Sequence, residues 1–339
     1  MKIGIVNDVS LAIEALRQAL ALRPRHQVVW VAHDGAEAIT HCARETPDLV
    51  LMDLLMPGVG GVEATRRIMT ATPCAILVVT VNVGTNASQV FEAMGYGALD
   101  AIDTPQLGSG DLRVGAEPLL TKIDAIERLL CNRNGASVTA AVTSDSTSLA
   151  ADRLVAIGAS AGGPAALAVL LQGLPRDFPA AVVVVQHVDQ QFAAGMAEWL
   201  GQHSVLPVKL AQAGARPSAG MVLLAGTNDH LILKDANRLG YTSEPRDYAY
   251  RPSVDVFFES VCRSWSGTAV GVLLTGMGRD GARGLKALRD KGYYTIAQDR
   301  ASSAIYGMPK AAADLGAAVD VLPIDRIAAA VARLFSGNA

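Results

Sequence analysis

Three polar residues in the second half of the chain have the types that acyl transfer requires. Ser160 lies in the glycine-rich segment IGASAGGP, His187 follows the apolar run VVVVQ, and Asp280 lies in GMGRDGARG. In acyl transfer a histidine takes the proton of the serine hydroxyl, and a carboxylate orients the imidazole. Each residue alone also has a structural interpretation: an idle turn serine, a structural histidine, or an aspartate that caps a helix. Their combination is what favours catalysis.

The elements predicted around these residues bring them together. Apolar runs of strand length at 153–160, 180–187 and 269–276 end at or shortly before the three residues. Because the carboxyl ends of parallel strands meet at one edge of a sheet, we expect the three side chains at that edge. The chain order Ser, His, Asp differs from that of α/β-hydrolases and of the two large serine-protease groups. That order argues against those folds, but serine-dependent acyl transfer stays possible.

The segment around Ser160 predicts a sharp turn from a strand into a helix. Glycines on both sides of the serine permit the turn, Pro164 suits the first turn of the helix, and the helix N-terminus supplies free N–H groups. A dinucleotide phosphate loop is the runner-up interpretation. Its G-x-G-x-x-G spacing needs a glycine where Ser160 stands, and the next strand ends in Gln186 and His187 rather than in an acidic residue.

Polar residues also follow neighbouring strands in the first half of the chain. Asn7 and Asp8 end the first predicted strand, Asp53 ends the third, and Thr80 ends the fourth. A single acidic residue in a loop is usually a solvated surface group. Several such groups at successive strand ends favour a site for a phosphoryl group and a hard divalent cation, because Mg²⁺ takes carboxylate and carbonyl oxygens.

Both halves of the chain alternate apolar strands with helix-period segments, which predicts an α/β protein with two doubly wound, mainly parallel sheets. Residues 1–130 form the first predicted domain and residues 153–337 the second, which includes hairpin strands between Leu206 and Tyr241. Residues 131–152 are rich in Ser, Thr, Ala and Asn and predict a linker. The strands predicted in the first domain span 3–6, 27–31, 48–53, 74–80 and 98–102, and its fifth helix begins at about Leu119.

The composition is that of an ordinary globular protein. The chain has 339 residues, 50% of them hydrophobic and 18% charged, with a formal net charge of −3. The absence of any run of Lys and Arg argues against nucleic acid as a partner. No stretch approaches the roughly 18 apolar residues of a membrane helix, and the N-terminus lacks the zones of a secretory signal. We therefore expect a cytoplasmic protein without membrane insertion.

Residues 1–130 resemble a response-regulator receiver domain, which has a flavodoxin-like fold, through the segment DLVLMDLLMPGVGGVEA. The resemblance implies that Asp53 is the phosphoacceptor and that Thr80 contacts the phosphoryl oxygens. It also implies a Mg²⁺ site made by Asp8, Asp53 and the backbone carbonyl of Leu55. The implied phosphodonor is the histidine kinase of a chemosensory pathway.

Three positions depart from the usual receiver pattern. Asn7 stands where the family usually has a second acid, Ala101 where many receivers have an aromatic switch residue, and Thr104 where they have a lysine before a proline. An ammonium group at position 104 would offset the charge of an aspartyl phosphate. We therefore expect that Asp53 is still phosphorylated but that phosphorylation couples differently or more weakly to output.

Residues from about 153 to 335 resemble the Rossmann-like catalytic domain of CheB-type chemotaxis protein-glutamate methylesterases. The resemblance rests on five motifs in order: IGASAGGP, VVQHVDQQF, RPSVDVFFES, LLTGMGRDGA and AQDRASSAIYGMPKAA. It implies that Ser160 is the nucleophile, His187 the general base and then acid, and Asp280 the orienting carboxylate. The implied reaction is hydrolysis of glutamyl methyl esters on methyl-accepting chemoreceptors, with glutamine deamidation as a second activity.

The same resemblance implies further details of the site. The backbone N–H groups of Ala161 and Met277 would form the oxyanion hole, and the catalytic domain needs no cofactor. Arg251 and Ser253 in the third motif are either substrate contacts or packing and capping residues. The segments NDVS and DTP are most similar to the Wsp-type branch, which is linked to surface sensing and cyclic-di-GMP output.

Two other classes of function stay open from the sequence. A DNA-binding response regulator would need a basic recognition helix, and the output half is too long and too apolar for one. A catalytically silent scaffold that only binds receptors or signalling partners would share this sequence pattern, because a sequence does not display triad geometry. For the enzyme, the domain order predicts that the unphosphorylated receiver blocks the esterase site.

Overall fold

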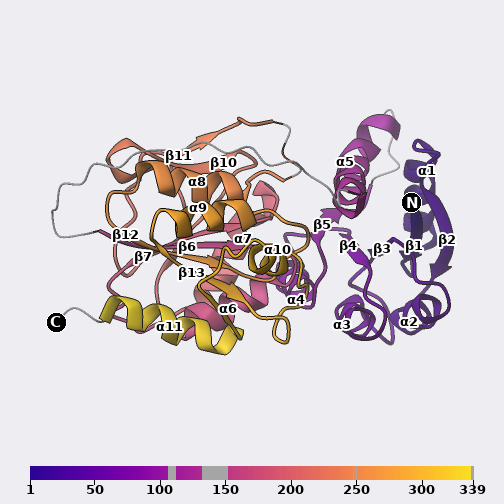
Figure 1. Cartoon of the computed structure of the whole chain (residues 1–339). Helices are drawn as coiled ribbons and strands as arrows, with labels where there is room; N and C mark the ends of the chain where they lie inside the picture. The colour runs from indigo at the N-terminus through magenta and orange to yellow at the C-terminus, as the bar shows by residue number, and fades with distance from the viewer. Residues whose placement is uncertain (106–111, 132–151, 247, 249, 337–339) are drawn as a thin grey trace. The chain divides into compact units, whose positions relative to one another are not determined.

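The chain folds into two compact units, one within Met1–Arg133 and the other within Asn134–Ala339 (Figure 1). The computed structural model describes residues 1–105, 112–131, 152–246, 248 and 250–336. Each unit is an α/β fold around a parallel sheet, which confirms the predicted fold class. The predicted linker, 131–152, lies almost wholly outside the described residues.

The first unit is built on five parallel strands in the order β2-β1-β3-β4-β5. Every residue of β3 and β4 is buried, as expected for central strands that helices cover on both faces. Helices α1 and α5 lie on one face, and α2, α3 and α4 lie on the other (Figure 1). The elements are β1 (Lys2–Val6), α1 (Ser10–Ala21), β2 (Gln27–Ala32), α2 (Gly35–Arg44), β3 (Leu49–Met52), α3 (Gly61–Ala71), β4 (Ala75–Thr80), α4 (Ala87–Gly95), β5 (Asp100–Asp103) and α5 (Leu112–Cys131).

Two boundaries predicted for this unit were wrong. Helix α5 begins at Leu112 rather than near Leu119, and Pro118 lies inside it. Burial of Ala116, Leu119 and Leu120 on one helical face explains why the helix continues through the proline, since packing overrides local propensity. Strand β5 pairs with β4 over Asp100–Asp103. It therefore begins two residues after the start of the predicted strand, 98–102.

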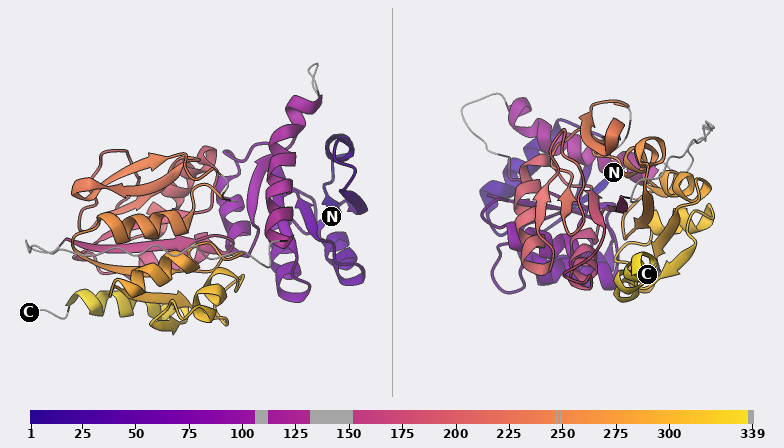
Figure 2. Two further views of the ribbon diagram at one scale, coloured as in Figure 1. Left: turned by 45° about the horizontal axis from the view of Figure 1, so that its top comes forward. Right: turned by 90° about the vertical axis from the view of Figure 1, so that its left-hand side faces the viewer.

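The second unit is built on a seven-stranded parallel sheet in the order β14-β13-β12-β6-β7-β9-β8. Helices α8 and α9 cover one face, and α6 and α11 lie on the other (Figures 1 and 2). The elements are β6 (Arg153–Ala159), α6 (Gly163–Gln172), β7 (Ala181–Gln186), α7 (Gln190–His203), β8 (Val208–Leu210), β9 (Val222–Leu224), β10 (His230–Lys234), β11 (Arg238–Thr242), α8 (Val254–Ser264), β12 (Thr268–Leu273), α9 (Ala282–Asp290), β13 (Tyr294–Gln298), α10 (Met308–Asp314), β14 (Asp320–Leu322) and α11 (Ile324–Ser336).

The predicted hairpin in the second unit is partly confirmed. Strands β10 and β11 form an antiparallel pair of their own and pack against α8. Strands β8 and β9, in contrast, join the large sheet as parallel strands. Strand β14 was not predicted, because none of its three residues is fully buried and the segment has no apolar run.

The three strands that carry the predicted triad are neighbours at the centre of the sheet. Strand β6 pairs with β12 on one side and with β7 on the other, so Gly158 lies beside both Leu273 and Val185. Phe257 and Phe258 of α8 are fully buried against this part of the sheet. The carboxyl ends of β6, β7 and β12 therefore open at one place on a rigid core.

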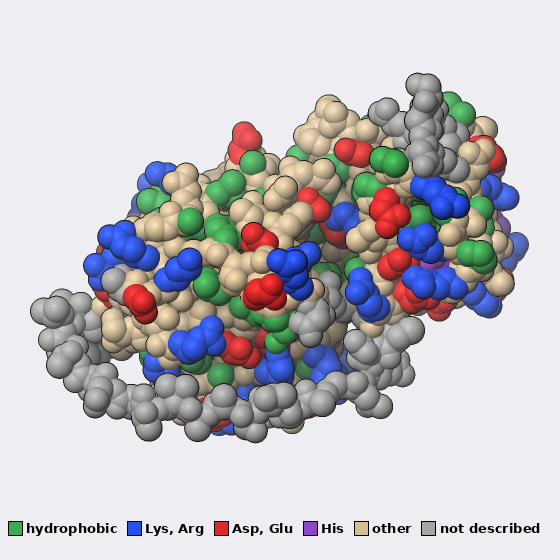
Figure 3. Space-filling view, turned by 90° about the horizontal axis from the view of Figure 1, so that it is seen from above, with side chains coloured by type: hydrophobic (Ala, Val, Ile, Leu, Met, Phe, Trp, Pro, Cys, Tyr) green, Lys and Arg blue, Asp and Glu red, His purple; other side chains and the backbone are tan. Residues whose placement is uncertain are grey.

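The surface carries charges of both signs. On the face in Figure 3, Lys and Arg side chains are interspersed with Asp and Glu on each unit. None of the helices in the described part of the chain is both long and apolar enough to cross a membrane.

Candidate active site

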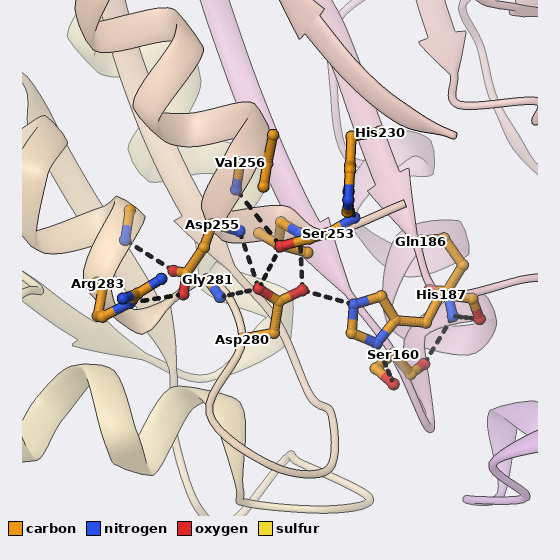
Figure 4. Close-up of polar contacts among 12 residues, drawn as sticks. Ser160, Gln186, His187, His230, Ser253, Asp255, Val256, Asp280, Gly281 and Arg283 are labelled. Atoms are coloured by element: carbon orange, nitrogen blue, oxygen red, sulfur yellow. Dashed lines mark hydrogen bonds and ion pairs between the residues drawn. The ribbon is translucent and has the colours of Figure 1, made fainter. Parts of the chain in front are cut away.

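Ser160, His187 and Asp280 form a continuous hydrogen-bonded chain (Figure 4). The Ser160 Oγ lies 3.1 Å from His187 Nδ1, and His187 Nε2 lies 2.7 Å from Asp280 Oδ2. Ser160 is 1% exposed and His187 4%, so water does not compete strongly for these bonds. The structure thus brings together the three residues that the sequence singled out.

The turn that carries Ser160 depends on close backbone packing. Gly162 has φ +78°, a conformation that favours glycine, and a Cβ at this position would lie 2.5 Å from the Cβ of Ala304. The Ser160 N–H donates to the Thr275 carbonyl at 3.0 Å, which ties the turn to the end of β12. The serine is therefore held by the sheet rather than by a free loop.

Gln186 fixes the backbone of both neighbouring triad residues. Its Nε2 donates to the carbonyl oxygen of Ser160 at 2.9 Å and to that of His187 at 3.2 Å. A Cβ on Gly163 would meet the Gln186 side chain at 2.0 Å, so glycine is needed there. No structural role was predicted for Gln186, although a polar residue at the end of a fully buried apolar strand indicates one.

Asp280 is held at the N-terminus of α8. Its carboxylate accepts hydrogen bonds from the Ser253 hydroxyl at 2.8 Å and from the N–H groups of Val254 at 2.7 Å and Asp255 at 3.0 Å (Figure 4). These donors and the positive end of the helix dipole stabilise a negative charge. Burial raises the pKa of Asp280, but the hydrogen bonds from His187 and from the helix hold it below its usual value. The carboxylate is therefore ionised.

The hydrogen bond between His187 and Asp280 determines which of the two imidazole nitrogens carries the proton. An ionised carboxylate only accepts, so Nε2 carries the proton and Nδ1 is left to accept from the Ser160 hydroxyl. In the chymotrypsin-type triad the two nitrogens have the opposite partners. The nitrogen that is placed to accept the serine proton is therefore Nδ1, which the sequence does not indicate.

Ser253 is a capping residue, which decides one alternative that the sequence left open. It is the N-cap of α8, where its Oγ accepts from the Val256 N–H at 3.4 Å while donating to Asp280. Its own N–H donates to His230 Nδ1 at 3.0 Å, and His230 is fully buried. His230 thus supports the carboxylate indirectly, a role that sequence reasoning missed because the two residues are 23 positions apart.

A second acidic residue lies directly behind Asp280. Asp255 is buried, accepts from the Gly284 N–H at 2.8 Å and pairs with Arg283, whose Nε lies 3.1 Å away. Burial and the charge of Asp280 raise the pKa of Asp255 to about 7. The two acids therefore have different roles, one ionised beside His187 and the other a buried link to α9.

The backbone N–H groups predicted to form the oxyanion hole have no acceptor among the described residues. Ala161 directly follows the serine, and Met277 follows Gly276, whose backbone passes so close to Ser160 that a Cβ there would lie 2.8 Å from the serine Cβ. In an oxyanion hole, each N–H donor stabilises the transition state by about 3 kcal/mol. The two groups stay the predicted oxyanion donors.

In the first unit, the predicted phosphoacceptor lies in a polar pocket. Asp53 is 5% exposed and accepts from Asn7 Nδ2 at 3.0 Å and from the Leu54 N–H at 2.7 Å. The Thr80 hydroxyl also bonds to it, but burial dominates and raises the pKa of Asp53. Asp8 is exposed beside this pocket. The structure thus gathers the predicted groups at the carboxyl edge of the sheet.

Thr104 has no side-chain contact that could take the place of the lysine found at this position in other receivers. Its N–H donates to the Thr80 carbonyl at 2.8 Å, which places it beside the pocket. Its buried Oγ1 has no hydrogen-bond partner among the described residues. A neutral, unpartnered hydroxyl therefore stands where a cation would offset phosphate charge.

Two family comparisons agree with this division of the chain. Residues 155–331 match the CheB methylesterase family, and residues 3–109 match the response regulator receiver domain. The chain belongs to the CheB methylesterase family. Its assignment to the Wsp-type branch stays a prediction.

Relatives in this family are similar over nearly their whole length. Protein-glutamate methylesterase/protein-glutamine glutaminase 4 of Burkholderia thailandensis is 62% identical over 338 residues, which cover 100% of this chain and 98% of the relative. The corresponding enzyme 3 of Pseudomonas aeruginosa is 61% identical and covers 99% of this chain and 100% of its own length. The crystal structure of the Thermotoga maritima CheB methylesterase catalytic domain is 33% identical, with a TM-score of 0.52, over 55% of this chain and 100% of that one.

For this CheB-family site, Asp280→Asn should lower kcat by roughly 10³- to 10⁴-fold, because an amide facing Nε2 favours the wrong imidazole tautomer. Release of methanol from a methylated receptor fragment measures the loss. Asp290→Asn, at the exposed end of α9, is the matched control and should retain wild-type activity. A folded Asp280→Asn protein within tenfold of the wild type would contradict the assignment.

Asp255→Asn should change how stability depends on pH. The unfolded chain releases this proton near 3.8, whereas the folded protein keeps it until about pH 7. The folded state therefore binds more protons in that interval, and the free energy of unfolding of the wild type falls as the pH rises through it. Urea unfolding at several pH values should show this slope reduced in Asp255→Asn. Parallel curves for the two proteins would show that Asp255 ionises normally.

Proposed function

We propose that this protein is a phosphorylation-regulated protein-glutamate methylesterase that removes methyl groups from glutamyl esters on methyl-accepting chemoreceptors. The observation that carries the proposal is the hydrogen-bonded chain from Ser160 through His187 to an ionised Asp280. The family membership supports the substrate class, because the similar relatives are named protein-glutamate methylesterase/protein-glutamine glutaminase.

The chemistry follows from the positions of the three side chains. The Ser160 Oγ attacks the ester carbonyl carbon while His187 Nδ1 takes its proton, and the Ala161 and Met277 N–H groups stabilise the oxyanion. His187 then protonates the leaving methoxide, and methanol departs from an acyl-enzyme. A water molecule, deprotonated by Nδ1, releases the glutamate side chain and restores Ser160.

A glutamine side chain can follow the same path. Its amide carbonyl presents the same electrophilic carbon, and the leaving group is then ammonia instead of methanol. The names of both relatives include a glutaminase activity. Deamidation of receptor glutamines is therefore the proposed second activity, and this unit needs no cofactor for either reaction.

The receiver unit is proposed to control the esterase through phosphorylation of Asp53 by the histidine kinase of a chemosensory pathway. Asp8, Asp53 and the Leu55 carbonyl oxygen form the proposed Mg²⁺ site. The donor set fits, because it consists of oxygens and because burial raises the pKa of Asp53, which a cation would counteract. Bound Mg²⁺ would offset the negative charge of the phosphoryl group, which Thr80 would contact. This pathway implies a cytoplasmic location.

The alternative from another class is a silent scaffold that binds receptors without hydrolysing them. Methanol release from methylated receptor cytoplasmic fragments separates the two functions. The intact protein should release methanol, and Ser160→Ala should reduce the rate by about 10⁵-fold or more, to background. A folded wild-type protein that releases none from a proven substrate would favour the scaffold.

Phosphorylation of the receiver should occur despite Thr104. A small-molecule phosphodonor should label the wild type at Asp53, and Asp53→Asn should stay unlabelled. Thr104→Lys should lengthen the life of the label or strengthen its effect on methanol release, because the ammonium offsets phosphate charge. Equal labelling of wild type and Asp53→Asn, or none in either, would refute this part of the proposal.

The unphosphorylated receiver is proposed to inhibit the esterase by restricting access of a bulky helical substrate. Removal of residues 1–135 should therefore raise methanol release from receptor fragments. The catalytic domain of the Thermotoga maritima relative has been crystallised alone, which supports folding of the truncated protein. Unchanged or lower activity of the folded truncation would show that the receiver is not inhibitory.

A further inference from the structure

An aromatic ring covers the imidazole of the proposed catalytic base. The ring of Tyr250 is stacked on that of His187, with centroids 4.0 Å apart and planes 19° from parallel. Stacking occupies the face of the imidazole and leaves both ring nitrogens in plane for Ser160 and Asp280. Tyr250 is not part of the hydrogen-bonded chain of Ser160, His187 and Asp280.

The segment that carries Tyr250 is anchored to the carboxylate side of the triad. Three residues later, Ser253 caps α8 and donates to Asp280. Two residues earlier, Tyr248 packs edge-on against His230, with centroids 5.9 Å apart, and its hydroxyl accepts from Arg283. The chain is therefore anchored on both sides of Tyr250, and on one side the anchor is a hydrogen bond to Asp280.

Acyl transfer places a positive charge on His187, because Nδ1 takes the serine proton while Nε2 keeps its own. The face of an aromatic ring is the negative part of its quadrupole and attracts a cation within about 6 Å of its centroid. The stack with Tyr250 meets that distance. It can therefore favour the imidazolium over the neutral ring, in addition to restricting rotation of the side chain.

We propose that Tyr250 is a positioning residue of the esterase whose ring face holds the His187 imidazole toward Ser160 and stabilises the imidazolium formed during acyl transfer. The proposal rests on the proposed function, since it assigns His187 a proton-transfer role. It extends the Ser, His, Asp set by a residue that acts through the base.

Three charged groups near His187 belong to other elements than Tyr250. Asp280 contacts Nε2 from the loop before α9, and Asp255 of α8 lies behind Asp280. Arg283 of α9 pairs with Asp255. A substitution at position 250 therefore removes none of these three charged side chains.

The experiment compares Tyr250→Leu and Tyr250→Phe with the wild type in the full chain. Tyr250→Leu removes the π face, whereas Tyr250→Phe keeps it and removes only the hydroxyl. The first readout is kcat and KM for methanol release as a function of pH. The second is an NMR titration of labelled histidine in the absence of substrate, with the His187 signal assigned by its loss in His187→Gln.

Tyr250→Leu should lower kcat by roughly 3- to 30-fold and leave KM nearly unchanged. In the NMR titration, protonation of His187 should be less favourable in Tyr250→Leu than in the wild type, and the acidic limb of the rate profile should move to lower pH. Tyr250→Phe should match the wild type in both measurements. This rescue by the conservative variant separates the ring from the hydroxyl.

Three results would overturn the proposal. In a folded Tyr250→Leu protein, an unmoved titration midpoint with unchanged kcat would show that the ring does not act through His187. A change confined to KM would make Tyr250 a substrate contact. A defect in Tyr250→Phe equal to that of Tyr250→Leu would assign the effect to the hydroxyl. Because the titration needs no substrate, it tests the stack even if the protein hydrolyses no ester.

Discussion

The active site depends on a carboxylate that is nearly buried and still ionised. An isolated charge of this kind costs several kcal/mol to remove from water, so it persists only where hydrogen bonds replace the lost solvation. Asp280 receives those bonds from Ser253, from two N–H groups at the start of α8 and from His187. The interaction joins the loop after β12 to the N-terminus of α8. It also determines which imidazole nitrogen carries a proton, and therefore which one faces the serine.

Both units place their functional side chains in the same way, although the proposed chemistry differs. In each, polar residues follow buried parallel strands, and the sheet brings the ends of those strands together. In the first unit the strand ends place Asn7 against Asp53 and Asp8 near it, an arrangement that fits the proposed phosphoacceptor and cation site. In the second they gather Ser160 and His187 from neighbouring strands, and the loop after β12 supplies the carboxylate. A rigid sheet positions the groups, and the loops determine the reaction.

Much of this arrangement could be predicted from the sequence, because it depends on local patterns. Apolar runs predicted the parallel strands. Polar residues at the ends of those runs predicted that Asp53, Ser160 and His187 are functional. Contacts between distant elements could not be predicted. Packing of α8 against the sheet brings about three such features. They are the orientation of the His187 ring, the capping role of Ser253 and the support from His230. The start of α5 was misjudged for the same reason, since packing carries that helix through Pro118.

Covalent labelling tests, without a receptor substrate, whether Ser160 is a nucleophile activated by His187. The intact protein would be treated with a serine-directed fluorophosphonate and examined by mass spectrometry. We expect a single adduct on Ser160 that is absent in Ser160→Ala and forms far more slowly in His187→Gln. Labelling of Ser160 at the same rate in folded His187→Gln, or an adduct at another residue instead, would show that His187 does not activate Ser160.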